Sequence, residues 1–343
     1  MSRRGSAAGR SVGMLTLVLS AACGGGRESA ATTGPGASSS VQVTVSGLVA
    51  LDPQTQGTYV VWTIDAAGTA RSLGALTVSG SDGALTALAP VTDLSQLLVT
   101  VQRPGDAALV PSPQTLLRGD WRSGRAVLAI ETVVTRGGLP LKQVPGQFTM
   151  FSPSDNFRNG YPSSEECGVW LFNMAPRQTP QNDMWVRLSP LTPGWTYEGW
   201  MVRDLGAADA IWLSYGKFLP DASGAVSSRD DTGWGAFSGV EDFQTAGEEE
   251  FPGDDWLSNP MGFPLSAGLR LPLDLREQNA QGGSRWTHVL TIEPMTDKGE
   301  PIGYERPFAI RPYRDPFGNQ APGVPRTITY RANGVPRGEA VRR

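Results

Sequence analysis

Two separate stretches of this chain carry the same set of short motifs in the same order. The paired motifs, first copy then second, are Val43–Leu48 and Val186–Leu191, Gly57–Trp62 and Gly194–Trp200, Ser72–Leu76 and Ser214–Phe218, Ser81–Ala84 and Ala222–Ala225, and Leu98–Gln102 and Val289–Glu293. The last pair is spaced more widely, so we expect an insertion in the second copy at about residues 229–286. Such a repeat constrains the fold because both copies should form the same supersecondary unit.

The side chains within these motifs alternate with a period of two residues, which is the period of a β-strand. If Trp62 and Ile64 point into a core, then Trp200 and Val202 do so too. The later strand of each copy places polar side chains at alternate positions, namely Thr100, Gln102, Thr291 and Glu293. We therefore expect sheets with one buried and one wetter face.

Glycine and proline, 42 and 27 residues, interrupt the chain too often for long helices, and no stretch keeps the 3.6-residue apolar period of a helix. Asp82-Gly83 and Ser223-Gly224 stand between expected strands, where hairpins need positive φ. The prediction is an all-β chain with two tandem antiparallel β-sandwich, Ig-like domains. The expected divisions are 1–22 signal peptide, 23–40 flexible tether, 41–135 first sandwich, 136–166 linker, 167–313 second sandwich with the acidic insertion, and 314–343 C-terminal extension with one short strand at 327–330.

The amino terminus has the order of an export signal. Three arginines precede the apolar run Val12–Leu19, which is too short to span a bilayer, and small residues then lead into Cys23. This end resembles the lipobox of bacterial lipoproteins, which implies cleavage before Cys23 and acylation of its thiol, for example with palmitate. The alternative is a plain secretory signal in which Cys23 occurs by chance. Residues 24–40 carry no apolar side chain larger than alanine and are expected to form a tether that reaches roughly 20–25 Å.

The charge of the exported chain limits its partners. Removal of residues 1–22 takes away three arginines and no acid, which lowers the formal charge from −4 to about −7. An acidic surface repels phosphate backbones and anionic headgroups, so nucleic acid is not an expected partner and the lipid is the expected membrane attachment. With Cys23 acylated, only Cys167 remains, so no internal disulfide is expected.

Several motifs of the first copy occur together at a characteristic spacing, namely Tyr59–Trp62, Ser72–Gly74, Asp82-Gly83, Val99–Gln102 and Pro111–Gly119. In this order they resemble the extracytoplasmic C-terminal domain of anti-sigma-K factors. The second copy is similar more loosely, through Thr291–Pro294 and Pro301. The resemblance implies an outer module that senses or regulates rather than catalyses. It does not extend to a cytosolic sigma-binding segment, so direct sequestration of a sigma factor is not expected.

Two residues are the first candidates for chemistry. His288 is the single histidine and stands at the position of Leu97 in the first copy, but nothing in the sequence supplies a nucleophile and an orienting acid for it. We expect a strand-edge or partly buried histidine. Cys167 precedes the apolar run 168–172, so we expect a small apolar residue that enters a strand rather than a reactive thiol.

The acidic insertion is the other candidate, because sandwiches often carry function in their loops. Its eleven carboxylates include the groups Asp230-Asp231, Glu248-Glu249-Glu250 and Asp254-Asp255, with Trp234, Trp256 and Trp286 among them. Paired carboxylates are compatible with Ca²⁺, but no Asp-x-Asp-x-Asp-Gly loop organises them, so a solvated acidic loop is expected and no metal site is assigned. Trp234 and Trp256 are candidates for binding a sugar or a protein, against the alternative that they fold down as a lid on the sandwich.

The sequence thus predicts a non-enzymatic lipoprotein of the cell envelope without a cofactor, a binding or sensory module that faces the periplasm or the exterior. Its partners are expected to be the membrane, through the lipid on Cys23, and an envelope protein or glycan that the sequence does not identify. The alternative is a carbohydrate-binding surface protein that uses the loop tryptophans. A third class, a hydrolase with a carboxylate pair in the insertion, needs a defined separation and a cleft.

Overall fold

A computed structural model describes residues 38–90, 94–107, 109–130, 133–152, 164–171, 186–220, 222, 224, 256–257, 269–294 and 307–343. The compact unit to which they belong runs from Ala37 to Arg343. Its regular elements in the described ranges are antiparallel strands and three short 3₁₀ turns, Arg136–Gly138, Glu165–Cys167 and Ala332–Gly334. The all-β prediction is confirmed. None of the helical segments in the described ranges has the length and apolarity needed to cross a membrane.

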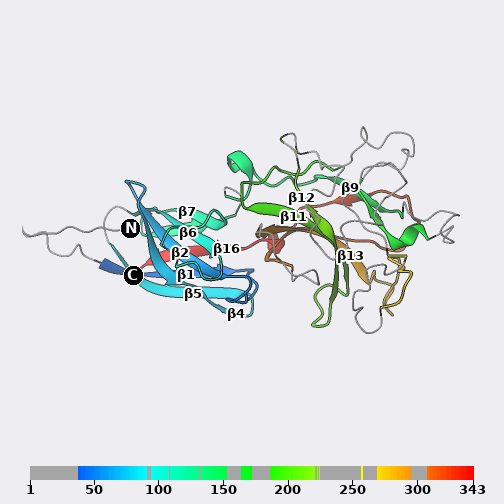
Figure 1. Ribbon diagram of the computed structural model, residues 1–343, viewed down its shortest axis with the longest axis horizontal. Coiled ribbons are helices and arrows are strands. Elements are labelled where there is room, and N and C mark those ends of the chain that lie inside the picture. Colours follow the sequence, from blue (N-terminus) through cyan, green and yellow to red (C-terminus); the bar gives the residue numbers. More distant parts are fainter. Residues whose placement is uncertain are drawn as a thin grey trace, which may run out of the picture. The chain divides into compact units, whose positions relative to one another are not determined.

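The first sandwich consists of a five-stranded and a four-stranded sheet (Figure 1). The five-stranded sheet has the order β4 (Thr77–Ser79), β5 (Asp82–Pro90), β1 (Ser38–Ser46), β16 (Arg337–Arg342) and β8 (Arg125–Leu128). The four-stranded sheet has the order β3 (Ala70–Ala75), β2 (Thr58–Asp65), β6 (Leu94–Gln102) and β7 (Thr115–Asp120).

The second sandwich consists of a four-stranded and a three-stranded sheet. The four-stranded sheet has the order β12 (Ile211–Phe218), β11 (Trp195–Arg203), β13 (Trp286–Pro294) and β14 (Ile310–Pro316). The three-stranded sheet has the order β10 (Val169–Trp170), β9 (Gly146–Met150) and β15 (Arg326–Ile328).

The end of the chain differs from the expected C-terminal extension. Strand β16 pairs with β1 on one side and with β8 on the other, so the last strand lies in the middle of the first sheet (Figure 1, red among blue and cyan). Ala340 is fully buried on its inner face, while Arg337 and Arg343 are exposed. The second sandwich is therefore inserted in sequence between two strands of the first.

The two four-stranded sheets are copies of one unit. Their strand orders correspond one to one, and Trp62 pairs with Leu98 just as Trp200 pairs with Val289. In both sheets the first hairpin has a β-bulge at the tryptophan: Leu73 is the extra residue in one copy and Tyr215 in the other. The Ser-x-Gly motif of the sequence is thus the signature of this bulge.

The correspondence ends at these sheets. Val43–Leu48 contributes the last four of the nine residues of β1, whereas residues 186–191 form no strand, and Leu191 makes only an isolated bridge with Thr135. The prediction of a positive φ was right for Gly224, at +86°, and wrong for Gly83. In the first copy Gly80 takes the positive φ, and Gly83 lies in β5, where a Cβ would come within 2.7 Å of Leu48 Cδ1.

Both faces of each repeated sheet are buried at the centre. Val99 and Val101 contribute to the main core, whereas Trp62 belongs to a small separate cluster on the opposite face. The expectation of a wetter face was wrong at these positions: Thr100, Gln102, Thr291 and Glu293 are each at most 5% exposed. The main core continues from one sandwich into the other, where the Phe308 ring lies 6.2 Å from that of Tyr59 and 5.8 Å from that of Trp195.

Candidate functional site: a polar relay present in both sheets

The outer face of the first repeated sheet carries a chain of buried hydrogen bonds. Trp62 Nε1 donates to Thr100 Oγ1 at 2.9 Å, and that hydroxyl donates to Gln102 Oε1 at 3.1 Å. The same oxygen accepts the Ser112 backbone N–H at 2.7 Å. The Gln102 side-chain amide donates to Asp106 and to the Val110 carbonyl. The loop after β6 is thereby held over the sheet, and the polar groups of the relay can be buried at low cost because they satisfy one another.

The second sheet repeats this relay with a charged residue. Trp200 Nε1 donates to Thr291 Oγ1 at 2.9 Å, and the Thr291 hydroxyl in turn bonds the Glu293 carboxylate. The carboxylate accepts the Phe308 backbone N–H at 2.9 Å and 3.1 Å. Tryptophan, threonine, acceptor and returning amide therefore have the same roles in both copies.

The backbone N–H groups of Ser112 and Phe308, which close the two relays, extend the repeat beyond what the sequence predicted. Ser112 follows Pro111 and Phe308 follows Pro307, and the two residues lie just before the start of β7 and β14 respectively. From the sequence, the resemblance of the second copy is based on Thr291–Pro294 and Pro301, and no counterpart of the closing segment Pro111–Gly119 is predicted there. The better signal is the Pro-x-x-x-x-x-x-Arg spacing that ends at Arg118 and Arg314, but the connecting loops differ in length and hide it.

In the second copy the relay is part of a row of charged groups across all four strands. Glu198 on β11 and Lys217 on β12 face each other, with Nζ and Oε2 3.9 Å apart, and Glu198 accepts the Ser214 hydroxyl at 2.7 Å. Glu293 on β13 and Arg311 on β14 complete the row. The first copy has Val60, Ala75 and Gln102 where the second has Glu198, Lys217 and Glu293.

Burial raises the pKa of Glu293. The hydrogen bonds from Thr291 and Phe308 and the charges of Lys217 and Arg311 oppose this shift. Arg311 is held in place by the Phe308 and Pro307 carbonyls, and its guanidinium carbon lies 4.7 Å from the centre of the Trp212 ring. Two carboxylates and two cations balance formally, and their burial carries a considerable desolvation cost.

The single histidine is a core residue rather than a strand-edge one. His288 is 1% exposed, and its Nε2 lies 2.8 Å from the Tyr215 hydroxyl. Burial lowers its pKa to about 3. The tyrosine ring occupies space left by Gly199, where a Cβ would lie 1.7 Å from Tyr215 Cζ. Gly199, Tyr215 and His288 stand at the positions that Val61, Leu73 and Leu97 occupy in the first copy. His288 therefore gives the buried Tyr215 hydroxyl a hydrogen-bond partner.

The described part of the predicted insertion packs into the second sandwich. Trp256 is 1% exposed, and its backbone bonds Cys167 and Leu273. Cys167 is buried with its Sγ 3.0 Å from the Leu273 carbonyl, in line with the expected small core residue. The lid alternative therefore describes Trp256, which has no exposed face to offer a sugar ring. Trp286 is likewise buried at the start of β13.

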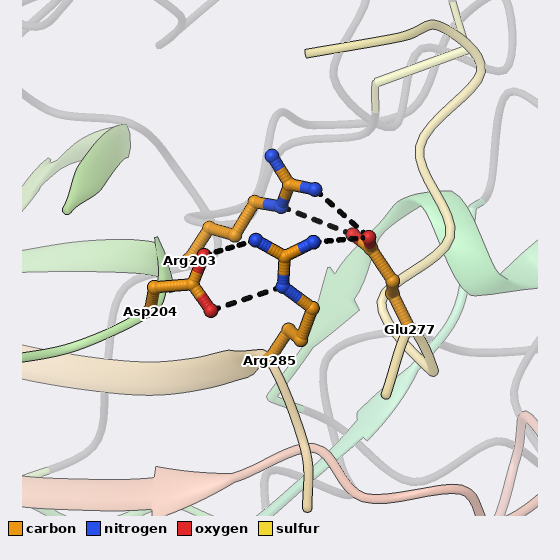
Figure 2. A network of polar contacts seen from close by, with 4 residues as sticks. All are labelled: Arg203, Asp204, Glu277 and Arg285. Carbon is orange, nitrogen blue, oxygen red and sulfur yellow. Dashed lines mark hydrogen bonds and ion pairs between the residues drawn. The ribbon is translucent and has the colours of Figure 1, made fainter. Parts of the chain in front are cut away.

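An ionic network outside the relay lies at the end of the second repeated sheet where β11 ends and β13 begins (Figure 2). Arg203 makes a bidentate contact to Glu277 at 2.8 Å and 3.0 Å, and Arg285 bridges Glu277 to Asp204. The Arg285 guanidinium holds the pKa of Asp204 below its usual value. The network joins the turn after β11 to the loop before β13, so it holds together the ends of these two paired strands.

The structure does not test the remaining predicted site residues. Cys23, Trp234, Asp230, Asp231, Glu248, Glu249, Glu250, Asp254 and Asp255 lie outside the described residues. Within the described ranges no three His, Cys, Asp or Glu side chains gather as metal ligands would. Comparison with protein-family models, with curated proteins and with solved structures gives no match.

Proposed function

We propose that this protein is a lipid-anchored, non-enzymatic component of the bacterial envelope, tethered through Cys23, that acts as a binding or sensory module. In this proposal the two sandwiches have the role that the outer domain has in anti-sigma-K factors. The module is displayed on the periplasmic or outer side of the membrane.

One observation carries the proposal. The signal-like segment and Cys23 are followed by a stretch without large apolar side chains, residues 24–40, and the compact unit begins at Ala37, near the end of that stretch. This order suits a folded module held at a short distance from a bilayer.

The interior of the second sandwich also suits binding better than catalysis. The three buried carboxylates among its described residues are each at most 5% exposed: Glu198 is engaged with Ser214 and Lys217, Glu293 with Thr291 and Phe308, and Asp315 with Thr329 and Arg331. A general acid or base must reach a substrate, which these groups do not do in this arrangement. The carbohydrate-binding alternative loses Trp256 as a platform and depends on Trp234.

The anchor is tested by fractionation of cells that produce the full chain with Cys23→Ala. We expect the wild-type protein in the membrane fraction and the variant outside it. Cys167→Ala is the matched control, because it removes a buried cysteine and should leave the distribution unchanged. An unchanged membrane distribution of the Cys23→Ala variant overturns the anchor.

The binding role is tested by crosslinking in intact envelopes that contain the anchored chain, with the Cys23→Ala chain as reference. We expect one protein or glycan to be crosslinked specifically and in proportion to the anchored protein. If no specific crosslink forms even when the anchored protein is abundant in the envelope, the proposed binding role is wrong, whereas the proposed anchor is unaffected.

A further inference from the structure

One end of the first sandwich concentrates arginines although the exported chain is acidic. The turn between β7 and β8 places Arg122 and Arg125 on either side of Ser123-Gly124, both of which have positive φ. Their side chains are 82% and 62% exposed. A two-residue turn of this kind is rigid, so the two charges are held in fixed positions.

The last two residues join this turn. The Arg342 N–H donates to the Gly124 carbonyl at 2.9 Å, and the Arg342 guanidinium carbon lies 5.5 Å from the centre of the Trp121 ring. The Arg343 N–H donates to the Ser40 carbonyl at 2.8 Å. These contacts define an arginine end, made of Arg122, Arg125, Arg342 and Arg343.

Acidic residues neutralise the arginine end only in part. Asp120 lies 3.4 Å from Arg122, and Glu339 pairs with Arg125. Among the described residues neither Arg342 nor Arg343 has an ion-pair partner. Counting the carboxylate of the last residue, four arginines stand against three carboxylates, so the arginine end keeps about one net positive charge, whereas the exported chain as a whole is strongly negative.

The tether leaves the fold at the same end. β1 begins at Ser38, two residues before the carbonyl that holds Arg343, and Val41 pairs with Arg342. A lipid on Cys23 would thus hold the arginine end within roughly 20–25 Å of the bilayer, a distance set by the tether. Charges attract anionic headgroups once they come within about a Debye length, roughly 8 Å.

We propose that the arginine end lies against anionic phospholipid headgroups and so orients the first sandwich on the membrane. The inference rests on the proposed lipid anchor for the short distance, and it adds a second, electrostatic contact. The acidic remainder favours the same orientation, because an anionic bilayer repels it.

The test uses an anchor that does not depend on acylation. The chain from residue 23, with Cys23→Ser and a hexahistidine tag before it, is bound to phosphatidylcholine vesicles that contain a nickel-chelating lipid, with or without phosphatidylglycerol. Ser123→Cys then provides one accessible thiol for a fluorophore, because Cys167 is buried. Energy transfer to a headgroup-labelled lipid reports contact. A label introduced by Gln54→Cys marks the opposite end, since the turn that contains Gln54 precedes the start of β2.

We expect phosphatidylglycerol to raise the energy transfer from position 123 but not from position 54. Arg342→Gln with Arg343→Gln should return it to the level on phosphatidylcholine, with the contact population lowered about fivefold for each arginine. The control pair Arg136→Gln and Arg337→Gln, exposed arginines away from this end, should leave it unchanged.

Equal transfer from position 123 on both vesicle types, or transfer insensitive to Arg342→Gln with Arg343→Gln, would overturn the headgroup contact. Because the tag replaces the acyl anchor, failure of this assay is separate from failure of the Cys23→Ala fractionation.

Discussion

The Trp-to-Thr hydrogen bond of each repeated sheet makes a measurable prediction about the duplication. Thr100→Val and Thr291→Val each keep the shape of the side chain but remove the acceptor of a fully buried indole N–H. A buried donor left without its partner costs about 1–3 kcal/mol, so we expect about 2 kcal/mol for Thr100→Val. Thr291 also bonds a carboxylate, and the cost should be nearer to about 3 kcal/mol.

The assay is equilibrium unfolding in urea, with the loss assigned to the transition of the sandwich that carries the change. The dependence of stability on urea should stay constant while the midpoint falls. Thr44→Val on the exposed face of β1 is the control and should change stability by less than about 0.5 kcal/mol. Losses below about 0.5 kcal/mol for both buried threonines would refute the relay as a stabilising feature.

Three further predictions concern the second sandwich. Folding lowers the pKa of His288 from 6.5 to about 3, so the neutral imidazole contributes its full stability above pH 6.5, and this contribution is lost as the pH falls toward 3. The free energy of unfolding in urea should therefore fall by about 2 kcal/mol between pH 6.5 and pH 5. His288→Leu with Tyr215→Leu should abolish this pH-dependent loss. Gly199→Ala should cost about 3 kcal/mol or more by thermal unfolding, because the Tyr215 ring cannot move aside, and adding Tyr215→Leu should recover part of the loss; equal stability of the single and double variants would contradict this. Lys217→Met should cost about 3 kcal/mol by leaving the buried carboxylate of Glu198 without its cation, and Glu198→Val in the same chain should restore part of it; no recovery would show that Glu198 and Lys217 are not coupled.

The register of the repeated sheets could be read from the sequence because it depends on local alternation. Trp62 and Trp200 stand at equivalent positions of a period-two pattern, and a slip of one residue would turn every side chain to the other face. The polarity of the faces was harder to predict. Thr100 and Gln102 look like solvent-facing residues, but they are buried because the loop at Asp106–Ser112 supplies their partners.

Long-range pairing accounts for the other differences. Strand β16 pairs with β1, almost the whole chain away, and small residues such as Gly338 and Ala340 give it no strong apolar pattern. Trp256 lies in a segment of acidic composition, yet it packs in the core beside Cys167. Composition predicts whether a segment is soluble on average, whereas burial depends on which single side chains find a site.

The anchor is tested most directly by the intact mass of the amino-terminal peptide of the protein isolated from cell envelopes. We expect the mature chain to begin at Cys23, to carry diacylglyceryl and acyl mass on that residue, and to have lost residues 1–22. A peptide with an unmodified Cys23 thiol, or one that still contains the residues before it, would show that the protein is not anchored through Cys23.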